Sequence, residues 1–277
     1  MIGLIDRQFS DNIIARAEFK HQRFVIRNSR SGTGWIVLAL LMLLPALIAA
    51  LVQVGGVLLG VDVDGWSVWQ QPVGAIVAEA AQSALIIMNV ALYFVLHMVG
   101  LGLAYASITR EHSGKTWDVL LLTDVSARTL VMGKWRASLR ALWGDHLLLV
   151  ALRLGLLATV LQGMDAPNAP LMLLIGGATI IAFTLIDAAL TVALGVGAAL
   201  AGSARSIFGP AALITRLTFI MFITTLTPFV LWRFTQGQYS ATLIIALGLL
   251  ALWLTFIALA LSNALFGAVQ QHVSPSS

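Results

Sequence analysis

The chain has 277 residues, of which 59% are hydrophobic and only 10% carry a charged side chain. Soluble domains carry about 25% charged residues, so this chain lacks the charge that a water-facing surface needs. Several apolar runs exceed the roughly 18 residues that indicate a bilayer span. The composition excludes an ordinary soluble domain and predicts an all-α polytopic membrane protein.

The residue types also restrict the chemistry. There is no cysteine, which excludes disulfides, thiolate metal sites and thiol catalysis. No histidine has a second ligand at the spacing of a metal site. No carboxylate pair or Ser-His-Asp set is visible. We therefore expect no enzyme activity, no catalytic residue, no metal and no cofactor in this chain. The net charge of +4 is typical of basic cytoplasmic loops, so we expect no nucleic-acid partner.

The first predicted element is an amphipathic interfacial helix over residues 11–30. Basic residues recur there at spacings of four and three, which places them in one stripe of a helix: Arg16, Lys20, Arg23, Arg27 and Arg30. Ile14 and Val25 fall on the opposite side. A basic face toward lipid phosphates fits this pattern. The alternative is a basic flank that sets topology without helical order.

Six transmembrane helices follow in a single transmembrane domain that covers residues 1–277. The predicted spans are 34–59, 72–109, 139–161, 171–202, 210–232 and 241–269. About 20 residues cross the hydrocarbon of a bilayer. The second and fourth spans are longer than this, so we expect them to tilt or to project into water.

The distribution of Lys and Arg predicts the orientation. Basic residues gather before the first span and after the second, and Arg205 and Arg216 follow the fourth span. The connection after the first span has Asp62 and Asp64 with no basic residue. Because basic loops stay on the cytoplasmic side, both termini are predicted to be cytoplasmic. The expected location is the cell membrane.

Two charged residues lie near the middle of predicted spans, where charge is costly and usually functional. Asp187 falls near the middle of the fourth span and Arg153 near the middle of the third. An interhelical ion pair between them is one interpretation, and a polar substrate path or ion coupling are others. His97, in the second span, is typical of a hydrogen-bonded packing residue.

Small residues form two stripes with a spacing of four. One stripe is Ala189, Ala193, Gly197 and Ala201, and the other is Ala260, Ala264 and Ala268. This spacing puts each set on one helix face, where helices approach closely. Such stripes indicate packing within one subunit, with a dimer face as the alternative.

The connection after the second span contains Gly114, Lys115 and Thr116, the three residues that end a phosphate-binding loop. Such a loop needs an earlier glycine, five positions before Gly114, so that the backbone can fold around the phosphates. Thr109 stands there, and the triplet follows a predicted span rather than a strand. The triplet therefore does not predict a nucleotide site.

The same connection resembles the membrane subunits of type-2 ABC exporters. The matching positions are Arg110, Glu111, Gly114, Thr116, Asp118, Leu120 to Thr123, Ser126, Arg128, Gly133 and Lys134. The local match covers about 30 residues, and Asp124 stands where the family often has proline. The basic interfacial helix and the six predicted spans agree with this resemblance.

The resemblance implies that residues 110–123 form a coupling helix, which docks in a groove of a separate cytoplasmic ATPase. Trp117, Leu120 and Leu121 have the spacing of apolar anchors for a helix in a groove. Glu111, Lys115 and Asp118 would supply a polar rim. A solvated basic loop on the bilayer surface is the alternative.

The function implied is that of a permease subunit that exports a substrate. ATP and magnesium would bind to an ATPase dimer, and a second permease copy or a paralogue would complete the pathway within membrane lipid. Two other functions stay open. One is an ion-coupled secondary transporter that uses Asp187 and Arg153, and the other is a non-transporting membrane subunit of a larger complex.

Overall fold

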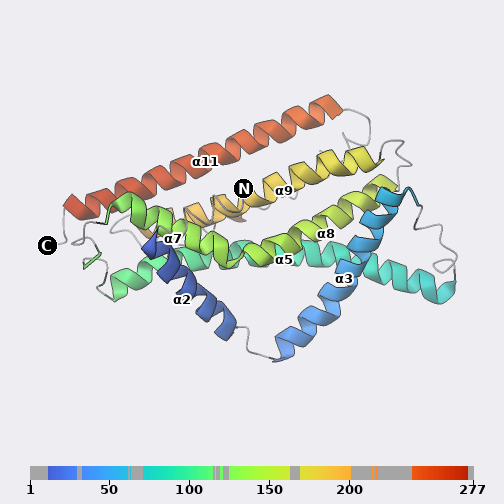
Figure 1. The fold of residues 1–277 in the computed structure, drawn as a ribbon, viewed down its shortest axis with the longest axis horizontal. Helices are drawn as coiled ribbons and strands as arrows, with labels where there is room; N and C mark the ends of the chain where they lie inside the picture. The colour runs from blue at the N-terminus through green and yellow to red at the C-terminus, as the bar shows by residue number, and fades with distance from the viewer. Residues whose placement is uncertain are drawn as a thin grey trace. The chain divides into compact units, whose positions relative to one another are not determined.

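The computed structural model describes residues 12–29, 33–61, 63, 71–114, 116, 119–120, 125–162, 169–200, 214, 216–217 and 239–273. Within these ranges every regular secondary-structure element is a helix and no strand occurs. The helices are α2 (Ile13–Ser29), α3 (Thr33–Leu59), α5 (Pro72–Ser113), α7 (Ala127–Ala141), α8 (Trp143–Gln162), α9 (Ala169–Leu200) and α11 (Tyr239–Val273) (Figure 1). The all-α prediction is confirmed for this part of the chain.

Five of the described helices are long and apolar enough to cross a membrane. The qualifying segments are Leu41–Leu59, Val73–Ser113, Trp143–Gln162, Ala169–Leu200 and Leu247–Gln270. They indicate a multi-pass membrane protein. The fifth predicted span, 210–232, lies outside the described residues except at positions 214, 216 and 217, so it stays a prediction, as does the orientation.

Helix α5 is longer than the predicted second span, which ended at residue 109. It runs for 42 residues to Ser113, and the backbone N–H of Gly114 donates to the carbonyl of Arg110 at 2.9 Å. Residues 110–113 of the predicted coupling helix are therefore the last turn of α5. At 1.5 Å per residue α5 is about 60 Å long, roughly twice the hydrocarbon thickness, so an end must project from the hydrocarbon.

A break at Leu142 separates α7 from α8. Ser126 caps the start of α7, where its hydroxyl oxygen accepts a hydrogen bond from the backbone N–H of Thr129 at 3.2 Å. α8 begins at Trp143, whereas the sequence predicted a span from residue 139. Leu139 instead belongs to α7 and packs against a buried hydrophobic cluster of the protein. Its apolar side chain therefore contributes to the protein core.

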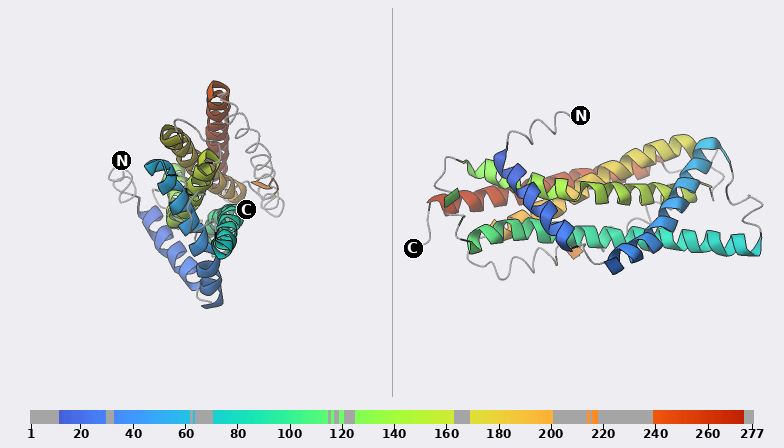
Figure 2. Two further views of the ribbon diagram at one scale, coloured as in Figure 1. Left: turned by 90° about the vertical axis from the view of Figure 1, so that its right-hand side faces the viewer. Right: turned by 60° about the horizontal axis from the view of Figure 1, so that its bottom comes forward.

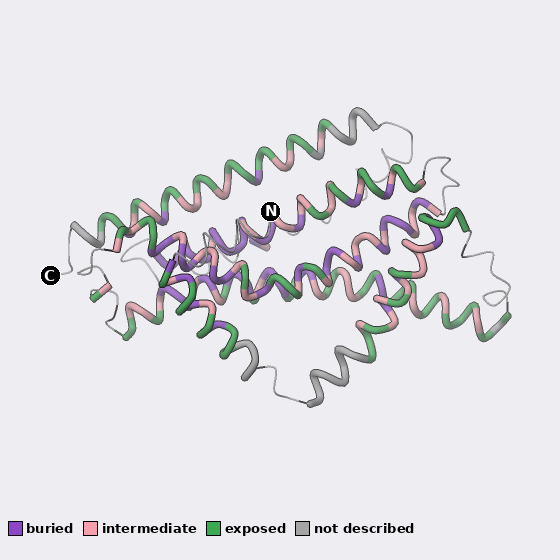
Figure 3. Tube along the Cα trace, viewed as in Figure 1, coloured by how far each residue is buried: buried purple, intermediate pink, exposed green. Residues whose placement is uncertain are grey.

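Contacts divide the chain into two compact units, and each is treated by itself. Unit 1 comprises Met1–Asn28, His97–Trp143 and Ile186–Ser277, and unit 2 comprises Ser29–Leu96 and Gly144–Leu185. α5 and α9 each contribute one end to either unit; their continuous course is seen in Figure 2. Figure 3 shows exposed and buried residues alternating along the helices.

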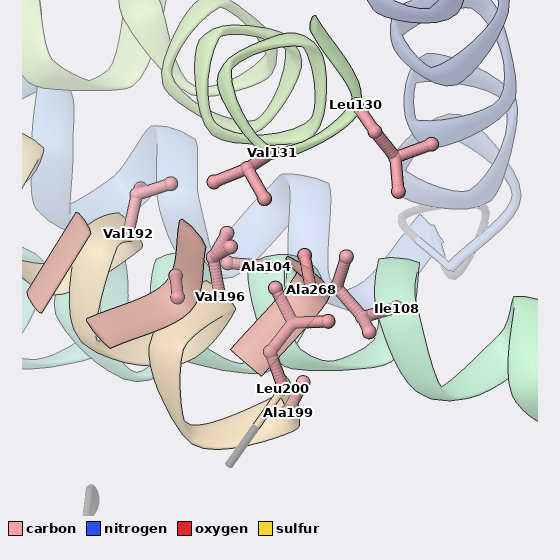
Figure 4. Close-up of a cluster of buried hydrophobic side chains, with 10 residues drawn as sticks. Ala104, Ile108, Leu130, Val131, Val192, Val196, Ala199, Leu200 and Ala268 are labelled. Carbon is pink, nitrogen blue, oxygen red and sulfur yellow. The ribbon is translucent and has the colours of Figure 1, made fainter. Parts of the chain in front are cut away.

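Unit 1 has a core built by four helices (Figure 4). Its buried residues are Ala104 and Ile108 of α5, Leu130 and Val131 of α7, Val192, Val196, Ala199 and Leu200 of α9, and Ala264 and Ala268 of α11. Gly195 permits the close contact of α9 with α5, because a Cβ there would lie 2.7 Å from the carbonyl oxygen of Leu101. This core holds α7 beside the end of α5.

The two small-residue stripes meet inside unit 1. A Cβ on Gly197 would lie 3.2 Å from the carbonyl oxygen of Ala260, and Ala193, Ala264 and Ala268 are completely buried. The interpretation of these residues as packing within one subunit is confirmed. Ala201 lies outside the described residues.

Unit 2 is held by α3, α5 and α8. Ala46 and Ala50 of α3, Leu85 of α5 and Leu152 of α8 form its buried cluster. Gly155 of α8 lies against Ala50 with no space for a Cβ. Apolar side chains such as Leu51 and Val73 are exposed, as expected of helices that face lipid.

Candidate functional site

The residues that flank the predicted coupling loop form a buried polar network in unit 1. Its centre is Lys134 of α7, whose side chain is only 3% exposed. The ammonium group donates to Glu18 of α2 at 2.6 Å, to Glu111 of α5 at 2.8 Å and to the carbonyl oxygen of Ser107 at 3.2 Å. One lysine therefore ties together three helices.

A second cation balances the network. The guanidinium group of Arg110 donates to the same oxygen of Glu18 at 2.7 Å, and it lies 3.5 Å from Glu111. The four side chains Glu18, Glu111, Arg110 and Lys134 sum to no net charge. Buried charge is tolerated only when it is paired and hydrogen-bonded, and this arrangement satisfies both conditions. The side chain of Arg110 is 41% exposed, so it forms the solvent-exposed edge of the network.

Two further contacts fix α2 against α7. Asn12 caps α2, since its side-chain oxygen accepts from the backbone N–H of Ala15 at 3.0 Å, and its amide nitrogen donates to the carbonyl of Thr129 at 3.0 Å. Gln22 donates to the hydroxyl of Ser138 at 2.9 Å. Gly133 packs tightly against α2, because a Cβ there would lie 3.0 Å from the Asn12 side chain.

The inward face of α2 was missed by sequence reasoning. The exposed positions Arg16, Lys20 and Arg23 agree with the predicted basic stripe, but Ile14 is partly buried, Val25 is exposed and the buried side is polar. Glu18 and Gln22 lie there, one turn apart. Glu18 is the only acidic residue of α2. Its position on the helix side opposite the basic stripe was the feature of the sequence that could have indicated a buried polar face.

Several predicted coupling residues come together at this network. Thr116 donates to the carboxylate of Glu111, so the loop is tied back to the end of α5. Both ends of residues 114–126 are thus anchored on the helices that flank them. Lys115, Trp117, Asp118 and Leu121 lie outside the described residues, and their predicted roles stay predictions.

Leu120, a predicted apolar anchor of the coupling helix, has contacts within its own chain, and its docking role stays a prediction. It is partly buried and packs against the core cluster of unit 1. Its neighbour Val119 is 60% exposed. The exposed surface of this segment therefore includes Val119, while the Leu120 side chain packs the segment against its own chain.

Asp187 lies in a second buried cluster of unit 1. Its carboxylate accepts two hydrogen bonds from Arg216, at 2.8 and 2.7 Å, and one from the indole N–H of Trp253 at 2.8 Å. His97 Nε2 lies 2.9 Å from the same carboxylate. The sequence analysis used Arg216 as one of the basic residues that set the orientation, but its side chain is completely buried and is paired with Asp187.

Arg153 has contacts within unit 2. Its guanidinium group donates to the hydroxyl of Thr184 at 2.7 Å and lies 4.7 Å from the centre of the Tyr93 ring, a cation–π distance. Asp187 belongs to the other unit, so the predicted pair of Arg153 with Asp187 stays a prediction. What the structure adds is a different basic partner for Asp187.

Comparison with protein-family models, with curated proteins and with solved structures finds no match for this chain.

Proposed function

We propose that this chain is the permease subunit of a type-2 ABC exporter, and that residues 114–126 transmit the work of a separate ATPase to the membrane helices. One observation carries the proposal. Lys134 joins Glu111 at the end of α5 to Glu18 on α2, so the loop between α5 and α7 has a fixed base. A loop on a fixed base can pass a displacement to the helices instead of yielding.

The connectivity suits such transmission. The loop follows directly after Ser113, the last residue of α5, and only Leu142 separates α7 from α8. Both α5 and α8 contain segments long and apolar enough to cross a membrane. A push on the loop therefore acts on two spans at once. It drives transport only if the ATPase binds the loop differently in its two states.

The remaining parts of the machine belong to other chains in this proposal. ATP and magnesium bind to a cytoplasmic ATPase dimer, and a second permease copy or a paralogue completes the substrate pathway. No chemical step is assigned to residues of this chain. The location that goes with this function is the cell membrane.

Val119 and Leu120 provide a matched test. We expect Val119→Glu to reduce co-purification of the ATPase with the detergent-solubilised chain by about 30-fold, the effect of losing a 2 kcal/mol hot spot. Its melting temperature should not change, because Val119 is exposed. Leu120→Ala should instead lower the melting temperature, since Leu120 packs on the core. Equal ATPase recovery with wild type and Val119→Glu would contradict the docking role of this segment.

A second function is favoured by the Asp187 cluster. A carboxylate that contacts a histidine between membrane-spanning helices is a common feature of proton-coupled carriers. Here His97 of α5 lies 2.9 Å from Asp187 of α9. If the chain is an ion-coupled transporter, Asp187→Asn should abolish gradient-driven uptake while folded protein is still recovered. Under the ABC proposal the same substitution lowers only the yield of folded protein, because Arg216 loses its counter-charge.

A further inference from the structure

A cavity of about 220 Å³ lies between α2 and the end of α5 in unit 1. Its wall includes residues at helical spacing on both helices: Glu18, Gln22 and Val25 on α2, and Leu103, Ala106 and Arg110 on α5. Each set extends over about 10 Å of helix. An apolar cavity of about 150 Å³ accommodates a benzene ring, so this cavity has room for part of an amphiphilic ligand.

The two ends of this cavity differ in polarity. Arg110, in the last turn of α5, donates to Glu18 at 2.7 Å, which makes one end polar. Val25 and Leu103 lie about two helical turns from this pair along α2 and α5, which makes the other end apolar. Leu103 is inside the segment Val73–Ser113, which is long and apolar enough to cross a membrane. The apolar end therefore lies against the body of a candidate membrane span.

Gln22 gives the cavity one unused hydrogen-bond acceptor. Its amide nitrogen donates to Glu18 at 3.0 Å and to the hydroxyl of Ser138 at 2.9 Å. A carboxylate that is already bound by two cations only accepts, so the amide nitrogen and not the oxygen must face Glu18. The Oε1 atom of Gln22 then has no donor within the described residues, although Gln22 is only 2% exposed. A buried acceptor without a donor is costly, so a donor on a ligand in the cavity would be stabilising.

Arg110 supplies donors without adding a net charge. Only its Nη2 nitrogen forms ion pairs, with Glu18 and Glu111, and its Nε and Nη1 groups donate no hydrogen bond within the described part of the chain. The two acids offset Arg110 and Lys134, and His21, which is exposed, is the other titratable residue of the wall. An ion in the cavity would upset this balance, so the polar group of the ligand should carry no charge.

We infer that this cavity binds a neutral lipid with a free hydroxyl group, of the diacylglycerol class. A hydroxyl group both donates and accepts, so it donates to Gln22 Oε1 and accepts from Arg110. These two side chains are neighbours, because both hydrogen-bond the carboxylate of Glu18. An acyl chain lies against Val25 and Leu103 at the apolar end, which a soluble polyol would leave empty. The site goes beyond the proposed function and does not depend on an ATPase.

Native mass spectrometry of the purified full chain tests the site with three probes that share the same acyl chains. The probes are dioleoylglycerol, its acetate ester, which lacks the hydroxyl donor, and dioleoylphosphatidic acid, which carries a phosphate in place of the hydroxyl. We expect wild type to bind dioleoylglycerol most tightly. The acetate ester should bind about fivefold more weakly, the effect of losing one neutral hydrogen bond.

A substitution that fills the cavity locates the site. Ala106 is an exposed residue of the wall, so Ala106→Trp should occupy the cavity and weaken dioleoylglycerol binding by more than about tenfold. Val95→Trp is the matched control, because Val95 is a 51% exposed residue of α5 about 16 Å from Ala106 along the helix. It should alter binding by less than about twofold. Equal binding to the two variants would overturn the location.

The comparison of probes on wild type does not depend on the folding of a variant. Equal affinities for dioleoylglycerol and its acetate ester would contradict the role of the hydroxyl group. Tighter binding of dioleoylphosphatidic acid would overturn the site in favour of an anionic lipid. Displacement of dioleoylglycerol by millimolar glycerol would overturn it in favour of a soluble polyol.

Discussion

Lys134 and Arg110 approach the same carboxylate oxygen of Glu18, at 2.6 and 2.7 Å, but they differ in burial. The side chain of Lys134 is 3% exposed and that of Arg110 is 41% exposed. A charge pair at a surface contributes about 0–1 kcal/mol, whereas removal of one partner from a buried pair costs about 3–5 kcal/mol. Burial, rather than distance, should thus decide which residue holds the network together.

This difference predicts unequal effects of two substitutions. Lys134→Met should destabilise the protein by about 3–5 kcal/mol, because it leaves Glu18 and Glu111 without their buried counter-charge. Arg110→Gln should cost about 1 kcal/mol or less. Thermal melting in detergent, with circular dichroism as the signal, measures both. Equal destabilisation would contradict the central place of Lys134.

A double variant separates charge from packing. Glu18→Gln with Lys134→Met removes an acid together with its partner, so it should be less destabilised than the sum of the two single variants. Additive losses would mean that the two side chains do not interact.

At the scale of helices, glycines set how closely α5 and α9 approach. A Cβ on Gly195 would lie 2.7 Å from the Leu101 carbonyl and 2.8 Å from Ala104 Cβ, whereas a Cβ on Gly102 would have no atom within 4 Å. Gly195→Ala should therefore destabilise the protein by about 1–3 kcal/mol through overpacking. Gly102→Ala should stabilise it by up to about 1 kcal/mol through helix propensity. Melting temperatures that change in the same direction would contradict this packing.

Element positions followed largely from hydropathy. The predicted spans 34–59 and 171–202 agree within two residues with α3 and α9, since long apolar runs have few alternative structures. The break at Leu142 was not predicted, because no proline marks it and the nearest glycine, Gly144, lies within α8. Leu139 has the hydropathy of a span residue, and only the packing of unit 1 assigns it to α7.

The pairing of the residues in the Lys134 network was not predicted from the sequence. Glu111 and Lys134 entered through the family resemblance, but their contact across 23 positions depends on the turn between two helices. Glu18 was missed, because a helical pattern shows which residues share a face and not which face is buried. Arg216 was missed as the partner of Asp187 for the same reason.

At the scale of the whole molecule, the number of spans decides the sides of the termini. The described residues contain five candidate spans, and the predicted span at residues 210–232, the fifth in chain order, would bring the number to six. An even number places both termini on one side of the membrane, and an odd number places them on opposite sides. Reporter fusions at Met1 and Ser277 should both report cytoplasm. A periplasmic or external signal at Ser277 alone would mean that 210–232 does not cross.

The proposed docking of residues 114–126 on an ATPase is tested most directly by site-specific cross-linking. The chain has no cysteine, so Val119→Cys creates a single thiol on the loop, and Val73→Cys creates a matched exposed thiol near the other end of α5. With a short heterobifunctional reagent in native membranes, Val119→Cys should form an adduct with a protein that carries a phosphate-binding loop. The adduct yield should change when ATP is added, and Val73→Cys should give no such adduct. An adduct-free Val119→Cys chain, labelled normally by a small maleimide, would contradict the claim.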